Sequence, residues 1–144
     1  MSEPMKRVVL ESPYAAPTPS GIDLNVRYAR ACVRDCLKRG EAPIASHLLF
    51  TQPGILRDEV PEERALGMAA GFAWGELAEA CVVYEDRGVS RGMLAGIARA
   101  EARGVPVERR KLGDWWAPEG GLERSLADES FRRELADEFA RNGL

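Results

Sequence analysis

One stretch, from Ala80 to Gly104, limits the possible folds of this chain more than any other. Cys81 to Tyr84 are apolar, with β-branched valines at the centre, which favours a buried strand. Asp86 to Gly92 then bring together an acid, glycines and a hydroxyl group, and Ser90 is suited to cap a helix that is expected from Ser90 to Arg103. This order predicts a strand, a tight turn and a helix N-terminus, an arrangement that offers free backbone N–H groups to anionic ligands at the carboxyl edge of a sheet.

The rest of the chain repeats this alternation of strand and helix, which predicts right-handed βαβ units and a parallel sheet. The expected strands are Arg7–Ser12, Pro43–Leu49, Cys81–Tyr84 and Val105–Arg110, and the expected helices are Leu24–Arg39, Pro61 to about Leu77, and Ser90–Arg103. The proline-rich segment 13–20 is expected to be a loop, because proline neither continues a sheet nor allows a helix to begin at once. Pro106 puts the last strand at or near an edge of the sheet. Glycines at positions 67, 71 and 75 predict a close-packing stripe, against the sheet or against a second subunit.

We therefore predict a single α/β domain over residues 1–144, with a flavodoxin-like or Rossmann-like three-layer fold. Its core, residues 7–110, would hold a four- to five-stranded, mainly parallel sheet. Residues 111–144 would add a loop with Trp115 and Trp116, which shield an edge or a subunit contact, and a C-terminal helix that begins at Asp128. Its apolar side would carry Phe131, Leu135 and Phe139.

Composition narrows the class of function. The net charge of -3 gives no electrostatic footprint for nucleic acid, whereas local anion pockets lined by arginine are compatible with it. No apolar run approaches the length of a membrane span, and residues 1–6 lack a signal-peptide pattern, so we expect a cytoplasmic protein that does not bind membranes. Cys32, Cys36 and Cys81 suit reduced thiols, and a single histidine, His47, argues against a metal site. No cofactor is expected.

The candidate site consists of residues that follow the ends of the first three strands. Parallel strands gather these positions at one rim of the sheet. The candidates are Ser12, Tyr14, Ser46, His47, Asp86, Gly88, Ser90 and Gly92. Asp86 can accept hydrogen bonds from ribose hydroxyls, although a capped turn with a structural aspartate explains the same pattern. His47 likewise suits either a structural hydrogen bond or catalysis, and Tyr14 and Tyr28 either stack on a base or cover the core.

The motifs Glu11-Ser-Pro-Tyr14, Asn25-x-x-Tyr28-Ala29, Pro43 to His47 and Asp86-x-Gly-x-Ser-x-Gly-Met93 resemble those of the nucleoside 2-deoxyribosyltransferase-like superfamily, in particular an uncharacterised branch found in phage and bacterial genomes. The resemblance spans residues 7–110. It implies a homo-oligomer with a nucleoside or nucleotide site, and adds Asn25, Tyr28 and Met93 to the expected ligand-binding residues. In the characterised transferases, an aromatic residue packs on the base, the aspartate of the third-strand turn contacts the sugar, and a glutamate after Gly-Met attacks the anomeric carbon.

The chain departs from that pattern at the nucleophile. Leu94, Ala95 and Gly96 follow Gly92-Met93, and Glu101 lies about two helical turns further on. Two hypotheses follow. The protein binds a nucleotide or an ADP-ribose-like small molecule without turnover, or it acts on an N-glycosidic bond with Asp86 as the catalytic residue and a carboxylate supplied from elsewhere, such as Glu62 or a neighbouring subunit. A third hypothesis is an assembly role in which the glycine stripe and the tryptophans matter.

Overall fold

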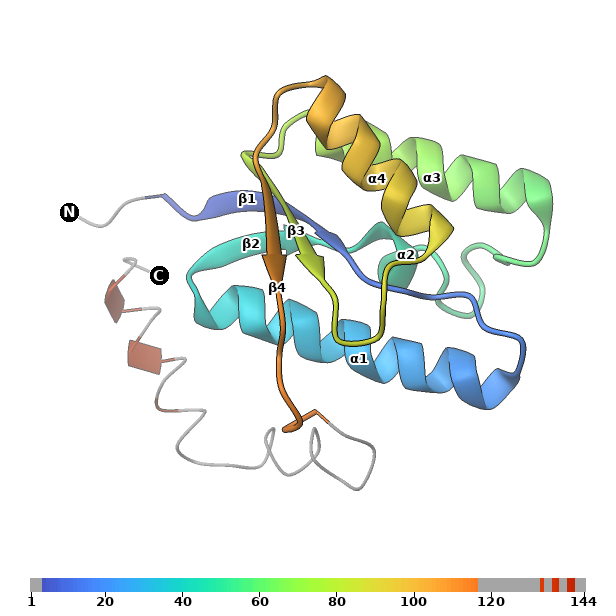
Figure 1. The fold of residues 1–144 in the computed structure, drawn as a ribbon, viewed down its shortest axis with the longest axis horizontal. Coiled ribbons are helices and arrows are strands. Elements are labelled where there is room, and N and C mark those ends of the chain that lie inside the picture. The colour runs from blue at the N-terminus through green and yellow to red at the C-terminus, as the bar shows by residue number, and fades with distance from the viewer. Residues whose placement is uncertain (1–3, 117–132, 134–135, 138–139, 142–144) are drawn as a thin grey trace.

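The computed structural model describes residues 4–116, 133, 136–137 and 140–141, and this part of the chain forms a three-layer α/β fold (Figure 1). The strands are β1 (Lys6–Glu11), β2 (Glu41–Ile44), β3 (Ala80–Tyr84) and β4 (Val107–Arg110), and the helices are α1 (Pro19–Lys38), α2 (Ser46–Leu49), α3 (Pro61–Gly75) and α4 (Arg91–Ala102). The strands form one sheet in the order β2-β1-β3-β4, and every pair is parallel. Helix α1 covers one face, and α3 and α4 cover the other (Figure 1). The predicted fold class is confirmed.

The core is divided into two layers by the alternation of side chains along the central strands. On the α1 face, Val8, Leu10, Val82 and Tyr84 pack with α1 residues such as Cys32. On the opposite face, Cys81 and Val83 of β3 pack with Met93, Ile97 and Ala100 of α4. The face of the sheet that each strand residue contacts therefore follows this period of two.

Two boundaries differ from the sequence-based expectation by several residues, and the others by two at most. Helix α1 begins at Pro19, well before Leu24, with Thr18 as its N-cap, whose hydroxyl accepts a hydrogen bond from the N–H of Gly21 at 3.1 Å. Proline at the first helical position needs no N–H partner, so the proline-rich segment runs directly into the helix. The predicted strand Pro43–Leu49 is wrong in its second half. Residues 46–49 form α2, because the N–H groups of Leu48 and Leu49 turn back to the carbonyl of Ala45 at 3.0 Å.

The prolines and glycines of the chain otherwise fit the prediction. Pro106 directly precedes β4, which lies at an edge of the sheet as expected. The glycine stripe on α3 packs within the domain, which agrees with the first of the two alternatives, packing against the sheet. A Cβ atom at Gly75 would lie 3.5 Å from Val9 of β1, and one at Gly71 would lie 2.5 Å from Ser46 Oγ. Glycine thus lets α3 approach both the sheet and α2 closely.

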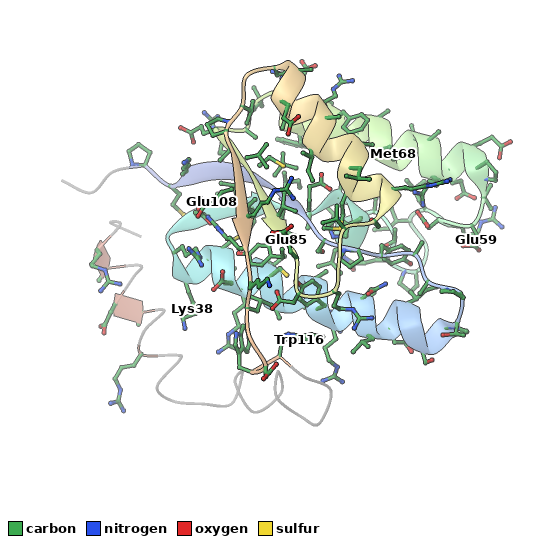
Figure 2. All side chains as sticks on the ribbon, viewed as in Figure 1. Lys38, Glu59, Met68, Glu85, Glu108 and Trp116 are labelled. Atoms are coloured by element: carbon green, nitrogen blue, oxygen red, sulfur yellow. The ribbon has the colours of Figure 1, made fainter. Side chains whose placement is uncertain are left out.

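The segment after β4 returns along α1 rather than covering a sheet edge. Trp116 is buried on the α1 side of the sheet (Figure 2). Its ring lies 4.8 Å from that of Tyr28, in a T-shaped arrangement. The Arg34 guanidinium lies 5.7 Å from the centre of the Trp115 ring. The expected C-terminal helix from Asp128 falls largely outside the described residues. Among the described residues, no helix is long and apolar enough to cross a membrane.

Candidate functional site

A cavity of about 330 Å³ opens at the carboxyl edge of the sheet, where residues of α3 and α4 line it. Its walls come from the end of β1 and the loop after it, from α2 and the segment that follows, from α3, and from the first turn of α4. The strand order reverses between β1 and β3, which is the point at which open α/β sheets bind their ligands. The cavity is therefore where the topology predicts a site.

Seven of the predicted site residues line this cavity, and four do not. Those that line it are Ser12, Tyr14, Ser46, His47, Ser90, Gly92 and Met93. Those that do not are Asn25, Tyr28, Asp86 and Gly88. The three chain segments therefore converge as expected, but the residue expected at the centre of the chemistry is not among them.

Asp86 has a structural position on the opposite face of the sheet. Its carboxylate accepts hydrogen bonds from the hydroxyl of Tyr28 at 2.6 Å, from the N–H of Leu112 at 2.9 Å and from the N–H of Gly113 at 3.1 Å. Partial burial raises the pKa of Asp86, but these hydrogen bonds outweigh it and hold the pKa below its usual value. The predicted catalytic position of Asp86 is corrected: this carboxylate fastens the segment after β4 to α1.

Strand periodicity explains this placement. Val82 and Tyr84 face α1, and Asp86 continues the same period of two past the end of β3. Tyr28 is fully buried and donates its hydroxyl to Asp86, so it belongs to the core rather than to a base-stacking surface. Gly88 takes a φ of 86° in the turn, a conformation that glycine adopts without strain.

Asn25 acts on the cavity indirectly. Its amide nitrogen donates to the carbonyl of Tyr14 at 2.9 Å, and its side-chain oxygen accepts from Nε of Arg87 at 2.9 Å. Asn25 is buried, so these bonds fix the loop after β1 from behind. The loop then presents Tyr14 to the cavity.

A serine and a histidine are hydrogen-bonded within the cavity. The distance from Ser12 Oγ to His47 Nε2 is 2.6 Å. His47 lies in α2, and burial lowers its pKa to about 4, so its ring is neutral at pH 7. A neutral imidazole has one nitrogen that can accept a proton. His47 can therefore act as a base that accepts a proton through the Ser12 hydroxyl group, which lines the cavity.

Glu11 is a cavity residue that we did not predict as a site residue. It is the last residue of β1, on the same side as Val9, and faces α4. Burial raises its pKa to about 8, so the carboxyl group is protonated at pH 7. Gly96 provides the room, because a Cβ atom there would overlap the Glu11 carboxyl group. The signal available in the sequence was an acid at the carboxyl end of a buried strand, on the α4 side of the period of two.

Two arginine side chains, Arg64 and Arg91, line the cavity where it meets α4. Nη1 of Arg64 binds Asp58 at 3.0 Å, and Nη2 lies 3.6 Å from the place a Cβ atom of Gly92 would occupy. Arg91 is exposed at the first position of α4, and within the described residues it forms no ion pair. The N–H groups of Arg91 and Gly92 lie in the first turn, where a helix has no internal acceptors and carries the positive end of its dipole. This end of the cavity favours an anion.

Apolar and aromatic side chains, Tyr14, Phe50, Met68 and Phe72 among them, form much of the remaining wall. Apolar walls with a few converging polar groups are typical of small-molecule sites. In the described part of the chain, no group of histidine, cysteine, aspartate and glutamate is arranged to hold a metal ion.

Comparison with known proteins gives a family but no activity. Residues 6–110 match the model of a family described as a domain of unknown function, DUF7768. None of the curated proteins matches the chain, and none of the solved structures does.

Proposed function

Because the chain belongs to the DUF7768 family, a domain of unknown function, we propose its function from the cavity itself: it binds a phosphorylated nucleoside-type small molecule. The observation that carries this proposal is the division of one cavity into an anion-favouring end at α4 and an apolar, partly aromatic remainder. Phosphate groups bind at helix N-termini, where free N–H groups and the helix dipole act together. The resemblance to nucleoside 2-deoxyribosyltransferase-like proteins supports the nucleoside part.

In this proposal the phosphate lies against the first turn of α4, between Arg64 and Arg91. Arginine binds phosphate oxygens through paired N–H donors, and Arg64 already has one of its nitrogens fixed by Asp58. The base lies against Tyr14 and the apolar side chains of α3, where an aromatic ring can stack on it. The cavity volume of about 330 Å³ lies within the range of small-molecule sites.

The proposal is tested by comparing ligands that differ only in the phosphate. Ribo- and deoxyribonucleoside 5′-monophosphates, the matching nucleosides, and inorganic phosphate are titrated by calorimetry and by thermal shift, which reports binding through mass action. We expect monophosphates to bind more tightly than nucleosides. Arg64→Gln and Arg91→Gln should each weaken monophosphate binding about 10-fold or more, the effect of losing a charge-assisted hydrogen bond, and leave nucleoside binding unchanged.

Arg30→Gln is the matched control, because Arg30 is exposed on α1, away from the cavity-lining residues. Equal affinity for nucleosides and their monophosphates, or arginine variants that bind as the wild type does, would refute the proposed phosphate position. Absence of binding by every member of the panel would refute the proposed ligand class.

A second candidate function is cleavage of the N-glycosidic bond of the same ligand. It is favoured by one specific observation, the buried carboxyl group of Glu11 at the wall of the cavity. The glutamate that the resemblance requires after Gly92-Met93 is absent, and here a carboxyl group reaches the same helix from β1, over Gly96.

A further inference from the structure

Glu11 differs from the other acidic residues at the cavity because no residue that the structure describes forms an ion pair with it. Asp58 forms an ion pair with Arg64 at 3.0 Å, and Glu63 forms one with Arg57 at 2.8 Å. Within the described residues, the Glu11 carboxyl group has no hydrogen bond or ion pair, although it is largely buried. Burying a carboxyl group without a partner is costly, so such groups are concentrated at functional sites.

The packing around Glu11 keeps this group in place. Gly96 of α4 lies so close to the carboxyl group that any larger residue would displace it. On the other side of Glu11, a second cavity of about 30 Å³ is too small for anything beyond a water molecule or two. Of the two cavities that Glu11 lines, only the main cavity has room for a ligand larger than water.

The second functional group is the hydrogen-bonded pair of Ser12 and His47, at 2.6 Å. Ser12 directly follows Glu11 in the chain, and strand alternation turns the two side chains to different sides of β1. Both still reach the same cavity. The carboxyl group of Glu11 and the Ser12 hydroxyl, through which His47 can accept a proton, thus line one cavity from neighbouring positions in the chain.

Resting on the proposed ligand class, we propose that Glu11 and His47 are the acid and the base of an N-glycoside hydrolase, with Ser12 relaying a proton between the attacking water and His47. Glu11 protonates the departing base of the nucleotide. His47, acting through the Ser12 hydroxyl, removes a proton from water.

Atoms and charges balance in this step. The bond between C1′ of the sugar and the nitrogen of the base breaks, and its electron pair stays on the nitrogen, which takes the proton of the Glu11 carboxyl group. The oxygen of water bonds to C1′ and gives a proton to Ser12 Oγ, while the proton of Ser12 passes to His47 Nε2. The products are a free base and a sugar phosphate. Solvent then returns a proton to Glu11 and removes one from His47. Water is the only co-reactant.

The protonation states agree with these roles. Burial raises the pKa of Glu11 to about 8 and lowers that of His47 to about 4, so between these values the acid holds its proton and the base is free to accept one. Two groups whose pKa values are driven apart by their environment mark an acid and base assignment. The charged or titratable side chains around them are Tyr14, Asp58, Glu63, Arg64 and Arg91 in the main cavity and Cys81, Arg99 and Arg103 in the smaller one.

The test separates binding from turnover in the full chain. Each nucleoside 5′-monophosphate of the panel is incubated with the protein, free base is measured by chromatography, and affinity is measured by calorimetry. Glu11→Gln and His47→Gln should each lower the rate of base release at least 100-fold while nucleotide affinity stays within about threefold, and Ser12→Ala should lower the rate less. Glu101→Gln, exposed near the end of α4, is the matched control and should match the wild type.

The pH profile gives a readout that a purely structural role would not produce. The rate should fall below a pKa near 4 and above one near 8, and Glu11→Gln should remove the upper limb. Wild-type protein that binds monophosphates without releasing base overturns this inference and leaves the proposed binding function standing. Absence of both binding and release overturns both. A folded Glu11→Gln variant, checked by its circular dichroism melt, that releases base at the wild-type rate overturns the role of Glu11.

Discussion

Glu11 and His47 should give this protein an unusual dependence of folding stability on pH. In the unfolded chain their pKa values return to about 4.5 and 6.5, whereas in the folded protein they are about 8 and 4. For Glu11 the stabilisation is fully present below about pH 4.5 and is lost as the pH rises to 8, because the folded state holds a proton that the unfolded state has released. For His47 the sign is opposite: the folded state holds fewer protons between pH 4 and 6.5, so stability rises with pH there.

The two effects oppose each other over part of the range. Each proton of difference changes the free energy of unfolding by about 1.4 kcal/mol per pH unit. Between pH 4.5 and 6.5 the two contributions cancel, and between 6.5 and 8 only that of Glu11 remains. The wild type should therefore lose on the order of 2 kcal/mol across the latter interval, and show little change from these two groups across the former.

Two variants separate the contributions. In Glu11→Gln, the free energy of unfolding should rise by on the order of 3 kcal/mol between pH 4 and 6.5 and then stay level. Of the two groups, only His47 then has a pKa that differs between the folded and unfolded states. In His47→Gln, stability should fall through the whole interval from pH 4.5 to 8. Urea unfolding at a series of pH values, followed by circular dichroism, gives these curves, and subtracting the wild-type curve removes every titration that the proteins share.

The control is again Glu101→Gln, whose curve should run parallel to that of the wild type. If Glu11→Gln also ran parallel to the wild type, the carboxyl group would have an ordinary pKa in the folded protein. Glu11 would then be solvated, and both the stability argument and the acid role built on its burial would be wrong.

Three further predictions concern other parts of the fold. Asp86→Asn should lower the free energy of unfolding by about 2 kcal/mol, since it weakens charge-assisted hydrogen bonds to Leu112 and Gly113, yet leave nucleotide affinity unchanged in calorimetry. Gly71→Ala should cost about 1 to 3 kcal/mol in urea unfolding, because its Cβ atom would lie 2.5 Å from Ser46 Oγ and α3 would have to shift. The homo-oligomer remains a prediction, and Trp74, which is 56% exposed on α3, is the side chain a second copy would cover. Trp74→Glu should yield monomers in light scattering, with no change for Arg30→Gln.

The sequence predicted the layers of this fold because each strand and helix carries its own local signal. The apolar run Cys81 to Tyr84 is buried throughout in β3, and Ser90 caps α4 as expected, accepting a hydrogen bond from the N–H of Met93 at 3.3 Å. The turn at Ala45, where β2 gives way to α2, carries no such signal. Ser46 to Leu49 are compatible with a strand, but in the structure they form a helix in which Ser46 packs against Gly71 of α3.

A cavity lies at the edge of the sheet where the sequence predicted a site, whereas Asp86, the predicted catalytic residue, lies on the opposite face. Topology alone brings Ser12, His47 and Ser90 together, so these were found. The prediction assumed that all side chains of the turn after β3 lie on the same face of the sheet. Side chains alternate along the strand, and the period that turns Tyr84 toward α1 also turns Asp86 there. The same counting along β1 would have placed Glu11 on the face of α4.

The segment after β4 covers the α1 face of the sheet at its carboxyl edge, and the cavity lies on the opposite face. At the carboxyl edge, Asp86 holds the N–H groups of Leu112 and Gly113, and Trp116 packs on Tyr28, so the segment after β4 covers the α1 side. On the opposite side, α3 and α4 meet above the point where the strand order reverses, and the space between them stays open. A ligand that enters there meets the end of the central strand β1. Of the β1 side chains on that face, Glu11 is the one nearest the carboxyl edge. A ligand bound in the cavity would therefore lie against the protonated carboxyl group of Glu11.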